Sequence, residues 1–251
     1  MNGDGVVLAL GLPDSAMVDR RVPKALLLEH GAPTAADKRR ITEGIEQLRW
    51  VAALKPSTVG IAAYQDSERE YLEIAVLQMM LRPAAKNARL VELLHRAVPH
   101  PVVAVCEQDS RATVSLAHKR WSLGEGGKTV LKGDVVAVDP EAAGEAIRDD
   151  FLAALALDRQ PRGSLFALYQ GWVEVLFACQ AAGRTHSFVV PGGADRRAAR
   201  CEALRECERL EAEIDRLRAA AVKEKQIPRQ VELNLEIKRL EAARAAAIAK
   251  L

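Results

Sequence analysis

Aromatic residues are scarce in this chain of 251 residues, which has three Trp, three Tyr and four Phe. Proteins that hold single-stranded nucleic acid by base stacking use several aromatic side chains, so the composition argues against a stacking platform. Net charge is also small, because 36 Lys and Arg stand against 34 Asp and Glu. This balance excludes a uniformly basic nucleic-acid coat but leaves room for a local basic face.

Cysteine is equally rare, and Cys106, Cys179, Cys201 and Cys207 form no Cys-x-x-Cys pair. Their spacing, with or without His186, matches no usual zinc site, so we expect no metal and no cofactor. No uninterrupted apolar run reaches the roughly 18 to 20 residues of a membrane span, and no basic segment typical of a signal peptide precedes the first apolar stretch. Unpatterned thiols in such a sequence indicate a cytoplasmic protein without a membrane partner.

The composition changes near residues 191–193 (Pro-Gly-Gly), which predicts a body at residues 1–190 and a tail at residues 195–251. The tail has no glycine, no aromatic residue and one proline, and its apolar residues recur every three or four positions, as on one face of a helix. Pro228 interrupts this stripe, and proline suits the first turn of a new helix. We expect a helical hairpin or coiled coil that associates with a partner or a second copy. The stripe residues proposed for this contact are Leu204, Leu210, Ile214, Leu217, Ile237 and Leu240.

The body alternates short apolar runs, typical of strands, with amphipathic segments, typical of helices. We predict strands or extended segments at residues 3–11, 58–64, 72–81, 102–106 and 112–118, and an edge strand at 135–138. We predict helices at residues 35–53, 84–97, 140–157 and 164–182. This order predicts an α+β fold with a mostly antiparallel sheet, helices packed on one of its faces, and the helical tail after it.

Two motifs resemble catalytic signatures but are incomplete. Residues 124–129 end like a phosphate-binding loop, yet Ser122 stands where the first glycine belongs and no helix-sized segment follows. Carboxylates cluster at residues 66–73, which include Glu73, and at residues 107–109, which include Asp109. Neither cluster continues into the acid-x-Lys pattern of a magnesium-dependent nuclease. We interpret the first motif as a surface loop and leave the catalytic residues unassigned.

Basic residues near the expected sheet ends are the candidates for contact with nucleic-acid phosphates. These residues are Lys24, Lys55, Lys119 and Arg120. The alternative is that they are dispersed, solvated charges. The arginines of the tail alternate with glutamates, which favours intrahelical ion pairs over a nucleic-acid surface.

The segment 222–240 resembles the C-terminal signature of a bacterial family, the domain-of-unknown-function family 4391. Shorter matching features are Val22-Pro23-Lys24, residues 45–58 with Trp50, Val98-Pro99-His100-Pro101 and Leu116-Ala117-His118-Lys119. They follow in the same order and cover nearly the whole chain. The resemblance implies no catalytic residue. It implies a context, because members resemble accessory genes beside helicases and DNA methyltransferases in restriction or phage-defence loci.

The leading hypothesis is therefore a non-catalytic accessory subunit of a bacterial DNA-processing or phage-defence system of the restriction–modification kind. It would dock a helicase or DNA methyltransferase, and it could also contact DNA. The alternative is a metal-dependent nuclease or phosphotransfer enzyme that uses the carboxylates at 66–73 or 107–109. A third hypothesis is an independent DNA-binding protein, whose affinity would depend strongly on salt.

Overall fold

A computed structural model describes residues 2–124, 127–190 and 192–251 of the chain. The chain divides into two compact units, Met1–Cys179 and Gln180–Leu251. The division falls inside helix α7 (Leu165–Thr185), upstream of the composition change at residues 191–193. Each unit is described by itself below.

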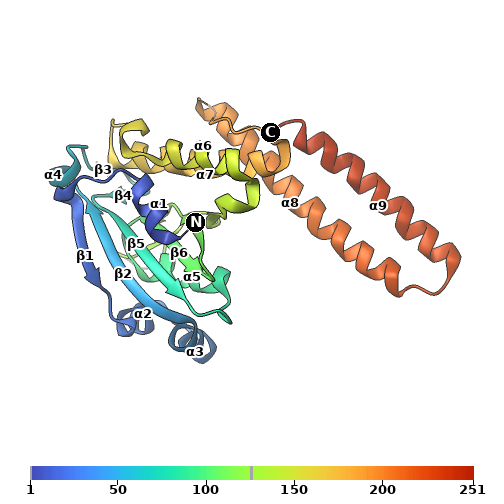
Figure 1. Ribbon diagram of the computed structural model, residues 1–251, viewed down its shortest axis with the longest axis horizontal. Helices are drawn as coiled ribbons and strands as arrows, with labels where there is room; N and C mark the ends of the chain where they lie inside the picture. Colours follow the sequence, from blue (N-terminus) through green and yellow to red (C-terminus); the bar gives the residue numbers. More distant parts are fainter. Residues whose placement is uncertain (1, 125–126, 191) are drawn as a thin grey trace. The chain divides into compact units, whose positions relative to one another are not determined.

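The main sheet of unit 1 has the strand order β1-β2-β5-β6-β7-β10 (Figure 1). Within this sheet β5 and β6 are parallel, and the other four neighbouring pairs are antiparallel. The strands are β1 Met17–Arg21, β2 Ile45–Leu54, β5 Ile74–Leu81, β6 Val102–Gln108, β7 Arg111–Leu116 and β10 Val136–Val138. The α+β class, the mostly antiparallel sheet and the edge strand at its end are thus confirmed.

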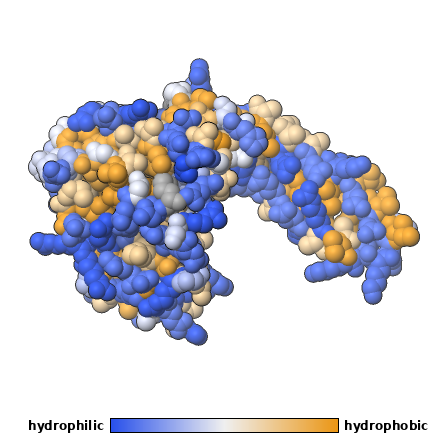
Figure 2. Space-filling view, in the orientation of Figure 1, coloured by the Kyte–Doolittle hydropathy of each residue, from blue (hydrophilic) through white to orange (hydrophobic). Residues whose placement is uncertain are grey.

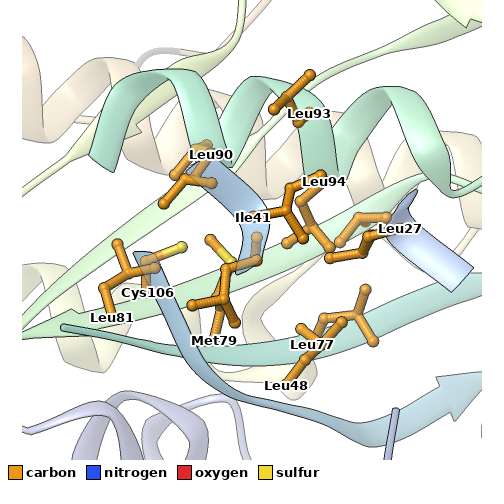
Figure 3. Packing of buried hydrophobic residues seen from close by; sticks show 14 of the residues in the cluster. Leu27, Ile41, Leu48, Leu77, Met79, Leu81, Leu90, Leu93, Leu94 and Cys106 are labelled. Carbon is orange, nitrogen blue, oxygen red and sulfur yellow. The ribbon is translucent and has the colours of Figure 1, made fainter. Parts of the chain in front are cut away.

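Helices α2 (Lys24–His30), α3 (Ala35–Gly44) and α5 (Asn87–Ala97) cover one face of this sheet. Successive side chains of a strand point to opposite faces, and β5 places Ala75, Leu77, Met79 and Leu81 on this side. Figure 3 shows Leu77, Met79 and Leu81 packed on the side of α5 that carries Leu90 and Leu94. The parallel β5–β6 pair needs a crossover connection, and α5 supplies it.

The opposite face of the sheet meets α1 (Gly3–Ala9), so helices cover both faces and the expectation of one covered face is wrong. Gln78 Nε2 donates to Asp4 Oδ1 at 3.0 Å, and the Gly3 N–H donates to Glu107 Oε2 at 2.8 Å. A Cβ on Gly3 would lie 2.7 Å from Gln78 Nε2. Glycine at the first position of α1 therefore lets the helix approach the sheet without displacing the Gln78 side chain.

Helix α6 (Glu145–Leu155) and most of α7 also belong to unit 1. Trp172 of α7 is fully buried, and its Nε1–H donates to the Leu155 carbonyl at 2.8 Å. By length and composition α7 could cross a membrane, which the sequence analysis did not expect. However, 67% of its most apolar window is buried inside the structure, as is typical of a core helix.

Three local predictions are wrong. Residues 3–9 form α1 instead of a strand, and the Asn2 side chain caps it by accepting the Gly5 N–H at 3.1 Å. The helix predicted at 35–53 ends at Gly44, where β2 begins. Residues 56–59 form the short helix α4, so the strand predicted at 58–64 shrinks to β3 (Tyr64–Gln65). The second error arises because β2 is buried on both faces at many positions, which imitates the spacing of a helical stripe.

Unit 2 contains a helical hairpin of α8 (Ala194–Lys223) and α9 (Ile227–Ile248), which lie side by side in Figure 1. The predicted hairpin is confirmed, and Pro228 stands in the first turn of α9. Two apolar clusters join the helices. The first contains Cys207, Leu210 and Ala247, and the second contains Ile214, Leu217 and Ile237. An Arg218–Glu241 ion pair of 2.6 Å adds a link at the surface.

A buried histidine of α5 predicts a specific sensitivity of the fold to acid. His95 has no exposed surface, and its Nε2 lies 3.1 Å from Ser115 Oγ of β7. Burial, together with the charge of Lys119, lowers the pKa of His95 to about 3. Between that value and the unfolded pKa near 6.5, the unfolded chain binds a proton that the folded chain does not, so stability falls as the pH falls.

We therefore expect His95→Gln to remove part of this acid sensitivity. Between pH 6.5 and 4.5 the wild-type free energy of unfolding should fall more steeply than that of the variant, by up to about 1.4 kcal/mol per pH unit. Urea unfolding at several pH values measures both slopes. The control is His30→Gln, at an exposed histidine, which should keep the wild-type slope. Equal slopes for wild type and His95→Gln would contradict the assignment.

Candidate functional site

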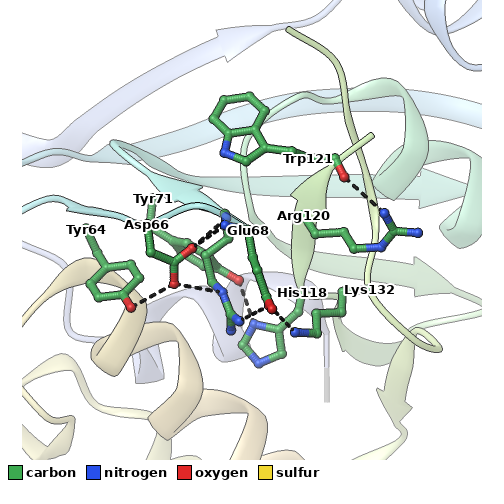
Figure 4. Close-up of polar contacts among 9 residues, drawn as sticks. Tyr64, Asp66, Glu68, Tyr71, His118, Arg120, Trp121 and Lys132 are labelled. Carbon is green, nitrogen blue, oxygen red and sulfur yellow. Dashed lines mark hydrogen bonds and ion pairs between the residues drawn. The ribbon is translucent and has the colours of Figure 1, made fainter. Parts of the chain in front are cut away.

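A polar cluster of unit 1 lies where two small hairpins meet (Figure 4). One hairpin pairs β3 with β4 (Glu70–Tyr71), and the other pairs β8 (Lys119–Trp121) with β9 (Thr129–Leu131). The Asp66 carboxylate closes the first turn, because Oδ1 accepts the N–H groups of Glu68 and Arg69 at 2.7 and 2.8 Å. The Tyr64 hydroxyl donates to Asp66 Oδ2 at 2.9 Å. Asp66 therefore shapes a turn.

Glu68 joins the two hairpins. Its carboxylate accepts from Lys132 Nζ at 2.8 Å, and its carbonyl accepts the Trp121 N–H at 2.7 Å. Hydrogen bonds from Lys132 and Arg69 lower the pKa of the Glu68 carboxyl. This carboxylate stays ionised at neutral pH and is engaged by two cations, so it is poorly suited to act as a general acid.

A cluster of ring side chains, Tyr64, Tyr71, His118 and Phe166, lies beside these turns. The buried Tyr71 hydroxyl is 2.6 Å from His118 Nδ1, and burial raises the pKa of Tyr71. The phenol therefore keeps its proton, and its hydroxyl lies within hydrogen-bond distance of the imidazole. Phe166 of α7 packs against Tyr64 and Tyr71 with ring centroids 5.0 and 5.1 Å apart, and the Arg69 guanidinium lies 5.0 Å from the same ring. The sequence analysis missed this cluster, although it gathers several of the chain's few aromatic residues.

The carboxylates of the nuclease alternative are not brought together. Glu73 precedes β5 and forms a 3.0 Å ion pair with Lys55, whereas Glu107 stands level with Met80 near the other end of β5 and binds the Gly3 N–H. Seven residues of strand separate these levels by about 23 Å. Asp109 occupies the β6–β7 turn with φ of 51°. In the described residues, no group of three or more His, Cys, Asp or Glu could hold a metal ion.

Lys24 and Lys55, two of the phosphate-contact candidates, lie at opposite ends of β2. Lys24 Nζ donates to the carbonyls of Ile45, the first residue of β2, and of Thr42. Lys55 directly follows Leu54, the last residue, and pairs with Glu73. A ten-residue strand is about 33 Å long. These two lysines therefore cannot share one compact phosphate site.

Lys119 has a structural position. Its side chain is 1% exposed, and Nζ donates to the carbonyls of His95 and Val98 at the C-terminal end of α5. The last carbonyls of a helix have no partner within it, so this ammonium group satisfies them. Burial lowers the pKa of Lys119 to about 8. Lys119 is thus no surface cation, which corrects its proposed role in phosphate contact.

Arg120, the fourth candidate, lines a groove of about 740 Å³ between α5 and the β8–β9 hairpin. Arg96 faces the same groove, but Glu92 and Asp134 line it too, and Arg96 pairs with Glu92 at 2.6 Å. The formal charges balance, which gives little attraction for phosphate. Residues 125 and 126 of the incomplete phosphate-loop motif lie outside the described residues. Its last residue, Thr129, begins strand β9 and not a helix.

A second cavity, of about 290 Å³, opens over the sheet between α2 and the end of α5. We call it the apolar recess. Its lining residues are Val22, Leu26, Leu27, His30, Leu48, Trp50, Glu73, Ala75, Leu77, Ala97, Val98, Pro99 and His100. Leu26 is 47% exposed at its edge, and Trp50 Nε1–H is bonded internally to the Ala52 carbonyl at 2.9 Å. The recess thus offers apolar surface with few polar groups.

The tail residues expected to meet a partner are largely used inside the chain. Leu204, Leu210 and Ile214 are each 1% exposed. Leu217 and Ile237 are 8% exposed, and Leu240 is partly buried against the hairpin clusters. The hairpin clusters contain or contact five of these side chains, and Leu204 is buried as well. A partner would therefore have to bind elsewhere on the tail.

A family model described as a domain of unknown function (DUF4391) matches residues 10–243. The chain belongs to this family. No curated protein and no solved structure matches the chain. The DUF4391 description carries no activity, so the function of this member has to be inferred from its own residues.

The position of Lys119 in this DUF4391 fold gives a second prediction. Lys119→Met should leave two carbonyls of α5 without their donor and destabilise the fold by about 1–3 kcal/mol. Between pH 8 and 10.5 the unfolded chain holds a proton that the folded chain has lost, so wild-type stability rises with pH relative to the variant. Thermal or urea unfolding at pH 7.5 and 10 should show the difference widening. Lys38→Met, at an exposed lysine, is the control, and a constant difference would argue against a buried ammonium.

Proposed function

We propose that this DUF4391 chain is a non-catalytic accessory subunit of a bacterial DNA-processing or phage-defence system in the cytoplasm. It would dock a larger helicase or DNA methyltransferase through the apolar recess of unit 1. The helicase or methyltransferase context comes from the family resemblance. The recess is the observation that carries the proposal, because it is a concave apolar surface formed by the folded chain alone.

The size and lining of the recess suit a partner's side chain. Its volume of about 290 Å³ is just below the range for small-molecule pockets, about 300–1,000 Å³. Protein interfaces gain most of their affinity from a few large side chains that fill pockets of this kind. Leu26 at the edge and Pro99 at the end of α5 would contact such an anchor. The polar residues His30 and His100 would contribute to a rim.

The polar groups of unit 1 support a binding role over the nuclease alternative. Asp66 and Glu68 hold turns, Glu73 pairs with Lys55, and Glu107 holds the first residue of α1. A metal-dependent nuclease needs carboxylates that converge on one point, and these lie at separate points of the sheet. Direct contact with DNA would be secondary, because the groove at Arg120 also contains Glu92 and Asp134.

Capture from the native host tests the proposal. The tagged full chain would be purified after nuclease treatment, and co-eluting proteins would be identified by mass spectrometry. We expect a helicase or DNA methyltransferase in stoichiometric amount. Leu26→Glu should reduce its recovery at least about tenfold, since a charge at the recess edge must lose water on docking.

Leu72→Glu is the matched control, because Leu72 is 44% exposed and lies outside the recess. It should retain the partner at the wild-type level. Circular dichroism and thermal melting would verify that both variants fold. A wild-type chain that elutes alone, or equal recovery with Leu26→Glu and wild type, would refute the proposal.

A further inference from the structure

Positive charge is concentrated in two segments of unit 1, α3 and residues 82–97, which end with α5. Together they contain seven Lys and Arg against three Asp and Glu, a balance of +4, whereas the whole chain carries only +2. The remainder of the chain is therefore slightly acidic. Figure 2 shows hydrophilic residues over the end of unit 1 where Figure 1 places α3. A local basic face is thus present although the net charge of the chain is small.

The two helices that carry these charges are in close contact. A Cβ on Gly44, at the end of α3, would lie 2.8 Å from Leu90 Cδ1 of α5. From β6, Gln108 Nε2 donates to the carbonyls of Pro83 and Ala85 at 2.9 and 3.0 Å, which holds the loop before α5. The backbone beneath therefore fixes the charged residues of both helices on one surface.

A chain of ion pairs crosses from one helix to the other. Asp37 of α3 is 1% exposed, and its carboxylate accepts Nε and Nη2 of Arg89 in α5 at 3.0 and 2.9 Å. Arg40 Nη1 donates to the same carboxylate at 3.1 Å. Glu92 then accepts Arg89 Nη1 at 2.7 Å and Arg96 Nη2 at 2.6 Å. Two carboxylates thus join three guanidinium groups, and the network keeps a net positive charge.

The buried carboxylate gives these arginines fixed positions. Hydrogen bonds from Arg89 hold the pKa of Asp37 well below its usual range, so this group is ionised at neutral pH. A buried ion pair generally adds little net stability over apolar residues of similar volume. The side chains of Arg40 and Arg96 nevertheless remain 40% and 54% exposed. Guanidinium groups that are held in place while they face the solvent lose little conformational entropy on binding an anion.

The chemistry of this surface fits a polymer with phosphates on its outside. Guanidinium groups bind phosphate through paired N–H donors. Arg89 and Arg96 are seven residues apart along α5, about 10.5 Å, so a single phosphate group is too small to engage both. Neither α3 nor residues 82–97 contains Phe, Trp or Tyr, and the bases of a single strand would find no ring to stack on. Duplex DNA, which keeps its bases inside, matches these properties.

We propose that Arg40, Lys86, Arg89 and Arg96 form a surface, the α3–α5 face, that binds the phosphate backbone of duplex DNA without regard to sequence. Lys86, which is exposed, immediately precedes α5. With about four phosphate contacts, the logarithm of the binding constant should fall with the logarithm of the salt concentration with a slope of about −3.6. This inference goes beyond the docking of a partner in the recess and does not depend on it.

Fluorescence anisotropy of the purified full chain with a labelled duplex of about 20 base pairs tests the proposal. Between about 50 and 200 mM NaCl we expect binding that weakens steeply with salt. The triple variant Arg40→Gln, Lys86→Gln, Arg96→Gln should bind at least about tenfold more weakly at 50 mM salt. Its slope should be shallower by about two to three, since each lost contact removes about 0.9. Arg89 is kept, because it is the bidentate partner of the buried Asp37.

A matched control removes the same charges from the tail. Arg229→Gln, Arg239→Gln and Lys250→Gln change three exposed residues of unit 2. Its two arginines also pair with carboxylates, Glu224 at 3.6 Å and Glu236 at 3.3 Å. This variant should keep the wild-type affinity and slope. Equal losses in both triple variants would show that affinity follows net charge alone and would refute a local face.

Further outcomes decide the remaining points. Circular dichroism and thermal melting check the fold of each variant, and Lys86→Glu alone, at an exposed side chain, should still weaken binding at least about threefold. No wild-type binding at 50 mM salt, or no weakening up to 200 mM, would overturn the proposal. Tighter binding of an RNA duplex of the same sequence would overturn the assignment to DNA.

The two proposals can fail separately. DNA binding is measured without a partner, whereas the capture experiment uses nuclease-treated extract. The triple variant of the α3–α5 face should therefore retain any protein that docks in the recess. Lost DNA binding with a retained partner, or the reverse, decides each proposal on its own evidence.

Discussion

Burial of β5 on both faces is the constraint on which unit 1 depends. Seven of its eight residues are buried, so helices must cover the sheet on both sides. One face takes α2, α3 and α5, and the other takes α1. The polar exception within the strand, Gln78, is 6% exposed, and Asp4 of α1 satisfies it. A strand that is buried on both faces therefore requires helices on both sides of the sheet, whatever the functional residues are.

Several polar groups that resemble catalytic residues serve this framework. Lys119 satisfies carbonyls at the end of α5, His95 bonds Ser115 across to β7, and Tyr169 donates to the Val102 carbonyl at 2.8 Å. Buried polar groups are costly unless they are paired, and each of these has a partner within the fold. Their lowered or raised pKa values follow from burial and do not indicate a reaction.

Sequence patterns predicted the elements whose periodicity is undisturbed and failed where burial is two-sided. The hairpin of α8 and α9, strand β6 and edge strand β10 follow from local spacing. Strand β2 could not be predicted in this way, because Ile45, Leu48, Val51 and Ala52 are spaced like the buried stripe of a helix. The apolar recess could not be predicted, since Val22, Trp50, Leu77 and Pro99 come from four separate segments that only the sheet register brings together. The burial of Lys119 could not be predicted from the sequence either. Its partners are backbone carbonyls, which every residue has, so no residue type marks them.

The tail shows how one amphipathic pattern can conceal another. Four residues of α8, Cys207, Leu210, Ile214 and Leu217, and the inner face of α9 are buried in closing the hairpin, which removes them as a docking surface. What remains outside is a weaker stripe, bulky at one end of α9 and small at the other. A stripe of uniform leucines would bind many partners with little selection of register. The exposed stripe of α9 instead concentrates its large side chains, Ile227, Val231 and Leu235, near the start of the helix, so its bulky apolar surface is short.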